Sequence, residues 1–382
     1  MHPIAIDLSG KMVKILAGAL LAGGLLSAIG GAWLHLRKDA ARRDQFGNYA
    51  LFGIIGGGVL MYFSGGRVAF SAFKDRWEPL PIYSYGVMLG VSLVVGWYVT
   101  LHYGRKSGLP RVKMAACYFW TAVAAIAGSR VLYVLTNPEE FTDASKIFAL
   151  REGGLVAYGG FLGGLVGSWV FARIKKMSLL SWADAAVPSL ATGLLFTRIG
   201  CLLYGCDYGR RIGEHPGAIA RAIAIQFPRW EEQNGAPAWS HHVRSTSEGG
   251  YGLDPGAAWS LPVYPTQILE SLLGAVLFVA LIFAWRRRKF SGQIFLIFAM
   301  LYAIGRYVLE TFRDDPERGS VGFFSTSQAI GLATGALALF FYLRLAKKAK
   351  ENPEGAIILH AEDGEPATEP AAQPGRRRRR RK

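Results

Sequence analysis

Charged residues are scarce in this chain of 382 residues, where they make up 18% of the sequence against 51% hydrophobic residues. Soluble domains carry about 25% charged residues, so the composition argues against a soluble globular protein. Cysteine is rarer still, with only Cys117, Cys201 and Cys206. Three cysteines are too few for a disulfide framework or a cysteine-built metal site, and we expect no metal and no cofactor. We interpret them as small packing residues, although the spacing of Cys201 and Cys206 also permits an oxidised pair.

Long apolar runs recur along the whole chain. A membrane-spanning helix needs about 20 predominantly apolar residues, and nine segments come close to this length. We therefore predict an all-α, polytopic membrane protein with about nine transmembrane helices. The predicted spans are Met12–Leu36, Tyr49–Phe70, Ile82–Leu101, Met114–Leu135, Gly154–Ile174, Ala183–Tyr204, Leu261–Trp285, Gln293–Leu309 and Ser325–Leu343.

The connections between these spans alternate between many and few basic residues, which predicts their orientation. The connections with many basic residues, expected in the cytoplasm, contain Arg37–Arg43, Arg105–Lys113, Arg173–Lys176 and Arg286–Lys289. The other short connections hold fewer, which places them and the long segment 205–260 in the periplasm. The N-terminus is then periplasmic and the C-terminus cytoplasmic. The first span lacks a clear cleavage site, so we expect it to be retained.

This pattern divides the chain into three regions. Residues 1–77 form an additional N-terminal pair of transmembrane helices, and residues 78–346 form the main membrane domain, in which residues 205–260 build a small periplasmic cap. Residues 347–382 form a cytoplasmic tail that ends in an arginine run and cannot bury a core, so we expect it to be disordered. Next to the inner leaflet, such a run favours attraction to anionic membrane lipid over binding of nucleic acid.

Three arginines lie within the predicted spans: Arg130, Arg198 and Arg306. A charge in the hydrocarbon region costs at least a few kcal/mol and is by default a sign of function. In the predicted orientation each lies in the outer third of its helix, so the three can gather around one anion, such as a phospholipid phosphate. For Arg306 a simple ion pair with Glu310, one turn later, explains the charge about as well. No acidic residue lies within one turn of Arg198, which favours ligand binding there.

Two further motifs belong to the same outer side. The segment "GGLVAYGGFLGG", residues 153–164, spaces small residues so that helices can approach closely, and it holds Tyr158 at its centre. Helix packing alone explains these glycines. The segment "YPTQILES", residues 264–271, begins a span with proline in the first turn and brings Gln267 and Glu270 into the outer leaflet region.

These blocks together resemble one family. The blocks "YSYGVMLG", "SRVLYVLTNPEEF", "GGLVAYGGFLGG", "TRIGCLLYGCDYGR", "YPTQILES" and "YAIGRYVLETFRDDPERG" follow one another between Ile82 and Leu343. In this order they are similar to those of the prolipoprotein diacylglyceryl transferases of the bacterial inner membrane. The resemblance covers some two thirds of the chain. It implies an enzyme that moves a diacylglyceryl group from phosphatidylglycerol to the lipobox cysteine of a prolipoprotein, in the first step of lipoprotein maturation.

The resemblance also implies roles for individual residues. Arg198 and Arg306 match arginines of the family's motifs, and they would hold the phosphate and stabilise the leaving group, glycerol 1-phosphate. Glu310 falls where the family keeps a glutamate after the second arginine. The other residues that we expect to bind phosphatidylglycerol are Tyr85, Arg130, Gly159, Gly160, Gly209 and Tyr302.

Three positions depart from the family's familiar pattern. Asparagine is usual at the position of Cys201, glutamate is frequent at that of Cys206, and better-known members carry histidine where this chain has Tyr158. The last change removes the obvious general base, and the departures together suggest a branch of the family. We assign Tyr158 and Glu310 as catalytic candidates for proton transfer, with Glu270, Asp207 or water as further options.

Other classes of protein remain open at this point. A transporter or channel for an anion or a lipid would spread its charges through the membrane depth, whereas these arginines cluster near one face. A scaffold protein would keep its function after loss of Arg198. A covalent enzyme would use Cys206 as its nucleophile, although the chemistry implied by the resemblance needs no nucleophile beyond the substrate thiol.

Overall fold

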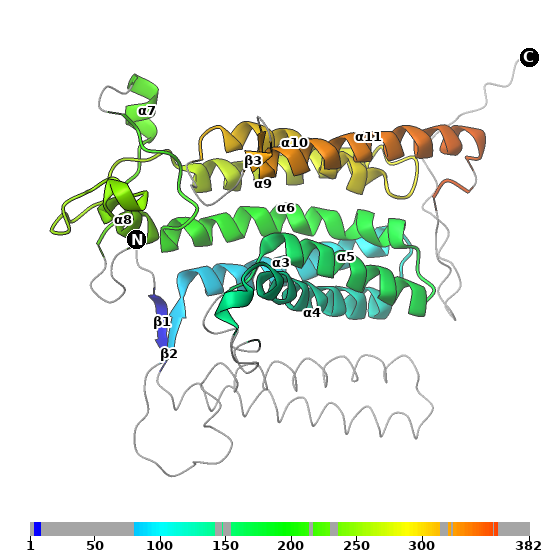
Figure 1. Cartoon of the computed structure of the whole chain (residues 1–382). Helices are drawn as coiled ribbons and strands as arrows, with labels where there is room; N and C mark the ends of the chain where they lie inside the picture. Colours follow the sequence, from blue (N-terminus) through cyan, green and yellow to red (C-terminus); the bar gives the residue numbers. More distant parts are fainter. Residues whose placement is uncertain are drawn as a thin grey trace, which may run out of the picture.

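Seven long helices form the body of the protein in a computed structural model (Figure 1). The structure describes residues 4–8, 80–141, 147, 154–213, 217–229, 236–313, 320–321, 324–353 and 355–357. The long helices are α3 (Ser84–Lys106), α4 (Arg111–Thr136), α5 (Ala157–Ile174), α6 (Leu179–Tyr204), α9 (Thr266–Trp285), α10 (Gln293–Glu310) and α11 (Thr326–Glu351). Each coincides with one predicted span. The spans predicted at Met12–Leu36 and Tyr49–Phe70 lie outside the described residues.

Short elements connect the long helices. They are β1 (Ile4–Leu8), β2 (Leu80–Tyr83), η1 (Pro138–Glu140), α7 (Ala218–Ile223), α8 (Pro237–Val243), η5 (Thr246–Glu248), β3 (Ser320–Val321) and β4 (Phe324–Ser325). Strand β1 pairs antiparallel with β2, with Ile6 opposite Ile82 and Leu8 opposite Leu80. Strand β3 pairs with β4 in the same sense. The part that the structure describes is thus mostly helical, with very little strand.

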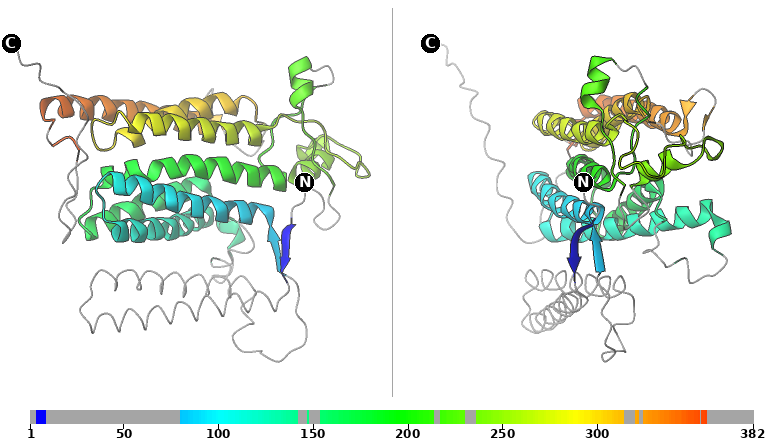
Figure 2. Two further views of the ribbon diagram at one scale, coloured as in Figure 1. Left: turned by 180° about the vertical axis from the view of Figure 1, so that it is seen from behind. Right: turned by 90° about the vertical axis from the view of Figure 1, so that its left-hand side faces the viewer.

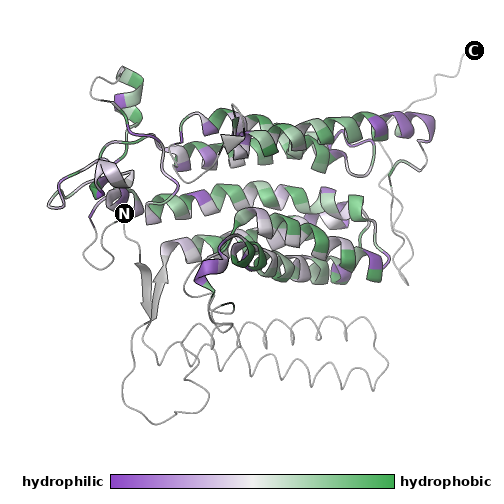
Figure 3. Cartoon of the chain, viewed as in Figure 1, coloured by the Kyte–Doolittle hydropathy of each residue, from purple (hydrophilic) through white to green (hydrophobic). Residues whose placement is uncertain are grey.

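The surfaces of the long helices are those of a membrane protein (Figure 3). Of the described helices, six are long and apolar enough to cross a bilayer. Large apolar side chains such as Val94, Leu162, Leu272 and Phe340 remain exposed on their outer faces. Lipid satisfies such faces, whereas water would not. The prediction of a polytopic helical membrane protein is confirmed.

Helix α6 forms the centre of the bundle (Figures 1 and 2). It packs along α3 on one side and along α9 on the other, while α4 pairs with α5 and α10 pairs with α11. Its buried residues include Trp182 and Ala185, in a core with α3 and α4, and Val187 and Ala191, in a core with α9 and α10. A residue carried by α6 can therefore reach side chains from both halves of the bundle.

Glycines allow α4 and α5 to approach closely. A Cβ atom on Gly159 would lie 2.4 Å from the carbonyl oxygen of Gly128, and one on Gly163 would lie 2.3 Å from that of Ala124. Real Cβ atoms do not come so near to backbone, so a side chain here would push the helices apart. The predicted close helix packing is present in this glycine block, and Gly160 faces the Ser129 side chain in the same interface.

A buried carboxylate fixes the end of the bundle at which α6 and α10 begin. Asp184, near the start of α6, accepts hydrogen bonds from the backbone N–H groups of Gly292, Ile294 and Phe295, where α10 begins. Arg288 pairs with the same carboxylate at 2.9 Å. Because the first N–H groups of a helix lack partners within the helix, Asp184 caps α10 and fixes its start against α6.

The segment between α6 and α9 folds into a cap at one end of the bundle (Figure 1). Its own small core contains Phe227, Ala236, Ala238, Trp239 and Val263, all buried. At the far end of the chain, α11 continues to Glu351 and so passes the predicted start of the tail at residue 347. Residues 358–382, with the arginine run, lie outside the described residues.

Candidate active site

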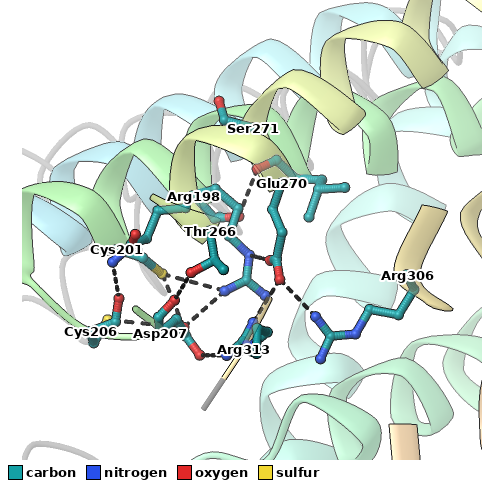
Figure 4. A network of polar contacts seen from close by, with 12 residues as sticks. Arg198, Cys201, Cys206, Asp207, Thr266, Glu270, Ser271, Arg306 and Arg313 are labelled. Atoms are coloured by element: carbon teal, nitrogen blue, oxygen red, sulfur yellow. Dashed lines mark hydrogen bonds and ion pairs between the residues drawn. The ribbon is translucent and has the colours of Figure 1, made fainter. Parts of the chain in front are cut away.

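Arginines from two helices and the following loop meet at one carboxylate at the cap end of the bundle (Figure 4). Glu270, in the first turns of α9, is buried and pairs with the Nη1 atoms of Arg306 and Arg313, each at 2.7 Å. Arg198, near the end of α6, pairs with the other oxygen of Glu270 through its Nε atom. Three guanidinium groups, one of them distant in the sequence from the other two, thus share one anion.

Two further carboxylates complete this set of ion pairs. Asp207, just after α6, pairs with Arg198 Nη1 at 2.9 Å and with Arg313 Nη2. Glu310, at the end of α10, pairs with Arg306 Nη2 at 2.8 Å and accepts a hydrogen bond from the Ser325 hydroxyl at 3.0 Å. We call the six charged side chains the arginine cluster. Its members are Arg198, Asp207, Glu270, Arg306, Glu310 and Arg313.

Asp207 occupies a strained place in the loop and is firmly ionised. Its φ of 54° is uncommon for a residue other than glycine. Burial opposes the charge of Asp207, but the guanidinium groups of Arg198 and Arg313 outweigh it and hold the pKa of this carboxyl far below its usual value. The ionised form of Asp207 is therefore the one that this site favours.

Hydrogen bonds to backbone fix the loop that carries Asp207. The Thr266 hydroxyl donates to the Asp207 carbonyl, and the Gln267 amide donates to the Cys206 carbonyl, both at 2.8 Å. Gly209 donates its N–H to the Tyr264 carbonyl at 3.1 Å, and a Cβ atom on Gly209 would lie 2.5 Å from that oxygen. The predicted binding residue Gly209 therefore serves a close approach between two backbone segments.

The structure joins several residues named from the sequence. Arg198, Arg306 and Glu310 belong to one cluster, and the ion pair considered for Arg306 with Glu310 is present. Tyr302 lies one turn before Arg306 on α10, stacked on Phe298. Arg198, which has no acidic residue within one turn in the sequence, pairs with Glu270 of α9 and with Asp207 of the loop after α6.

Two tyrosines lie near the same end of the bundle. Tyr85, in the first turn of α3, lies against Gly200 of α6, the residue directly before Cys201. Tyr158, in the first turn of α5, is 43% exposed, and its hydroxyl is 3.4 Å from that of Ser327 at the start of α11. Tyr158 thus lies where the α4–α5 pair meets the α10–α11 pair.

Arg130 uses its guanidinium in another setting. It donates to the carbonyl oxygens of Ile147 and Gly154, at 2.8 and 3.0 Å, and stacks near the rings of Tyr133 and Phe141. The sequence predicts that Arg130 joins Arg198 and Arg306. In the structure, the third arginine that pairs with Glu270 is Arg313 instead. These contacts fold the connection between α4 and α5 back onto α4.

Sequence reasoning undervalued three members of the cluster. The sequence assigns no role to Arg313, treats Asp207 as an optional proton acceptor, and treats Glu270 as an outer-leaflet residue and optional proton acceptor. A signal was available, because a buried arginine requires a partner and both acidic residues stand within the family-like blocks. The distances between the blocks, however, depend on how the helices pack.

Cys201, in the last turn of α6, and Cys206, just after the helix, both face Asp207. Cys201 Sγ lies 3.3 Å and Cys206 Sγ 4.0 Å from Asp207 Oδ2, and Arg198 Nη1 lies 3.8 Å from Cys201 Sγ. The two sulfur atoms and a carboxylate oxygen all lie within 4.8 Å of one another. We call these three side chains the thiol site. The interpretation of Cys201 and Cys206 as small packing residues does not explain why both face a carboxylate.

Comparisons with known proteins identify the family of the chain. Residues 68–344 match the sequence model of the family described as prolipoprotein diacylglyceryl transferase. The chain belongs to this family. It is therefore a transferase, and the resemblance stated from the sequence is confirmed.

Individual relatives support the same assignment. The chain is 33% identical over 254 residues to phosphatidylglycerol–prolipoprotein diacylglyceryl transferase 2 of Clostridium perfringens, a match that covers 66% of this chain and 87% of the relative. It is 29% identical over 279 residues to the phosphatidylglycerol–prolipoprotein diacylglyceryl transferase of Thermus thermophilus, covering 70% and 96%. The family's region thus extends over the bundle, the cap and the arginine cluster.

Proposed function

We propose that this protein transfers the diacylglyceryl group of phosphatidylglycerol to a cysteine thiol of a prolipoprotein. The family and the names of the relatives support these two substrates, and they give no support to a transporter for an anion or lipid. The observation that carries the proposal is the convergence of Arg198, Arg306 and Arg313 on one carboxylate at the cap end of membrane-spanning helices. Groups that hold a carboxylate in this way can hold a phosphate.

Arg198 and Arg306 are placed to contact the lipid phosphate. Their side chains are 21% and 14% exposed, whereas that of Arg313 is 2% exposed. Among the described residues, the contacts of Arg198 use Nε and Nη1, which leaves Nη2 for an incoming oxygen. Arg313 lies behind them and keeps Glu270 and Asp207 in position. The two outer arginines therefore bind the phosphate, and the inner one supports them.

The chemical step needs no protein nucleophile. The substrate sulfur attacks the glycerol carbon that bears the phosphate ester, a C–S bond forms, and the C–O bond breaks with its electron pair left on glycerol 1-phosphate. Arg198 and Arg306 stabilise the negative charge that grows on this oxygen. Binding both substrates in line removes much of the entropic cost of the encounter.

The thiol proton must also leave, and two residues are candidates to accept it. Glu310 is buried but already paired with Arg306 and Ser325, so it gains little from a proton. Tyr158 is accessible, but a neutral phenol hydroxyl is a poor acceptor for the proton of a thiol. Neither of these two residues is therefore well suited to remove the thiol proton.

Both substrates reach the site from the membrane. We place the cap and the arginine cluster on the periplasmic side of a bacterial inner membrane, with the N-terminus outside and the C-terminus inside. Phosphatidylglycerol then arrives within the outer leaflet, along Tyr85, Tyr302 and the junction at Tyr158. The prolipoprotein arrives by its signal peptide, which presents the lipobox cysteine at the same depth. Gly159 and Gly160 shape this route by holding α5 against α4, and Arg130 remains a predicted lipid contact.

The test is a transfer assay with purified protein in detergent. Incubation with phosphatidylglycerol and a lipobox peptide should give the mass increase of one diacylglyceryl group on the peptide. A peptide with serine in place of its cysteine should gain nothing. Arg198→Ala should abolish the product, whereas Arg173→Ala, a matched change in the last turn of α5, should leave the rate unchanged. Absence of the adduct from the unmodified protein would reject the proposed function.

A further inference from the structure

The end of α6 brings two cysteines together. Gly205 has a left-handed φ of 81°, and the N–H of Cys206 donates to the carbonyl of Cys201 at 3.2 Å. This is the hydrogen bond of a Schellman cap, in which the side chains of these two positions meet. The five-residue spacing therefore places two thiols side by side at the one helix end that also carries Arg198.

The thiol site has the dimensions of one face of a zinc tetrahedron. Zinc binds thiolate sulfur at about 2.3 Å and carboxylate oxygen at about 2.0–2.2 Å, which separates neighbouring ligands by roughly 3.5–3.8 Å. Here Asp207 Oδ2 lies 3.3 Å from Cys201 Sγ and 4.0 Å from Cys206 Sγ. All three ligand atoms lie within 4.8 Å of one another. The two sulfur–oxygen edges need shifts of a few tenths of an ångström, and the sulfur–sulfur edge needs at most about 1 Å, to complete the face.

We propose that Cys201, Cys206 and Asp207 bind a zinc ion whose fourth position takes the thiol of the prolipoprotein substrate. This proposal rests on the proposed function, since that function supplies the thiol. Three protein ligands with one open position are the arrangement of a catalytic zinc site, and thiolates select zinc over the harder magnesium and calcium ions.

The charges at the site can balance such an ion, which would share Asp207 Oδ2 with Arg198 Nη1, 2.9 Å from that oxygen. The two thiols both face the same carboxylate oxygen, so one divalent ion can replace two thiol protons and leave the local charge unchanged. Arg313 holds the second oxygen of Asp207, the role of an outer partner that orients a metal-bound carboxylate. The cation thus enters beside Arg198 without adding net positive charge to the arginine cluster.

The zinc ion would solve the problem of the substrate proton. On binding, the substrate thiol releases its proton to solvent and becomes a zinc-bound thiolate. Its sulfur then forms the C–S bond while the C–O bond breaks, and the electron pair goes to the phosphate oxygen held at Arg198. Arg198 Nη1 is 3.8 Å from Cys201 Sγ, so thiolate and phosphate would meet within one small site. A branch with tyrosine in place of histidine at residue 158 then needs no general base.

Metal analysis tests the proposal independently of activity. The protein is purified under reducing conditions, without chelator, and its zinc content is measured by mass spectrometry. We expect about one zinc ion per chain, a loss of that ion in Cys201→Ser and Cys206→Ser, and no loss in Cys117→Ser, which changes a buried cysteine elsewhere in the bundle. Cobalt added to the zinc-free protein should give a thiolate-to-cobalt absorption band that Cys206→Ser lacks.

The transfer assay adds a second readout. Removal of zinc, or Cys206→Ser, should lower the rate at neutral pH by about a hundredfold, the scale of a proton-transfer contribution. The residual rate should rise towards pH 8.5, the ordinary pKa of a free thiol, and zinc should restore the zinc-free protein but not the variant. A disulfide between the two cysteines, or full activity without zinc, would overturn the zinc proposal and leave the proposed function intact. Failure of transfer by the zinc-loaded protein would reject both.

Discussion

Neutralising Glu270 tests the arginine cluster most directly. The substitution Glu270→Gln keeps the shape of a side chain that is 3% exposed but removes the charge on which Arg198, Arg306 and Arg313 converge. An amide offers one oxygen, so at least one guanidinium group must face an NH2 group. Breaking a buried ion pair costs about 3–5 kcal/mol, and the remaining oxygen places this change near the lower end, at about 3 kcal/mol. We therefore expect a Tm lower by about 6–12 °C, at about 2–4 °C per kcal/mol.

Thermal unfolding in detergent, with and without inorganic phosphate, gives the measurement. In Glu270→Gln the three guanidinium groups retain two carboxylates, so an added anion compensates a missing charge. Phosphate should therefore raise the Tm of the variant more than that of the unmodified protein. Glu351→Gln is the control, because Glu351 is 65% exposed and its oxygen is 4.0 Å from Lys347, so its Tm should not change. An unchanged Tm for Glu270→Gln, or equal phosphate shifts in both proteins, would refute the reasoning.

Four other substitutions probe separate parts of the molecule. Arg198→Lys keeps the charge but loses the planar fork, so the initial rate of adduct formation should fall by about 10²–10³-fold, and a rate near that of the unmodified protein would exclude Arg198 from phosphate contact. Tyr158→Phe should cost less than about tenfold, whereas a loss of about 10²–10⁴-fold would identify it as the general base. Gly159→Ala should lower the free energy of unfolding by about 1–3 kcal/mol, since its Cβ would lie 2.4 Å from a carbonyl of α4, whereas Gly193→Ala, with nothing within 4 Å, should not lower it. Asp184→Asn should destabilise by about 3–5 kcal/mol yet keep the rate per folded molecule, and a selective loss of rate would contradict its placement at the far end of the bundle.

Much of the fold could be predicted from the sequence because lipid imposes simple rules on a chain. Apolar length alone located the seven described long helices; six of them begin and end within five residues of their predicted spans, whereas α11 continues eight residues past Leu343. The glycine block around Gly159 also predicts the close packing of two helices. Length and hydropathy do not determine which helices pack together, such as α6 with both α3 and α9. Apolar side chains on many sides of a helix do not select one neighbour.

From the sequence, only those site residues could be predicted that place a charge within a membrane span. Arg198 and Arg306 stood out because an arginine in a span is costly, and both lie in the cluster. Arg313 escaped because it follows α10, where a charge next to a membrane needs no special reason. The thiol site was not predicted for a geometric reason. Cys201 and Cys206 meet because of the left-handed turn at Gly205, and the spacing of two cysteines does not specify that turn.

The composition of the arginine cluster decides how it can act on a phosphate. Three guanidinium groups face the carboxylates of Asp207, Glu270 and Glu310, so the cluster has no net charge when all six groups are ionised. It cannot attract a lipid phosphate by bulk positive charge and must act through N–H groups held in fixed directions. The phosphate gains one negative charge as the C–O bond breaks, so these contacts strengthen along the reaction. Contacts that are stronger in the transition state than in the bound substrate lower the barrier instead of only tightening binding.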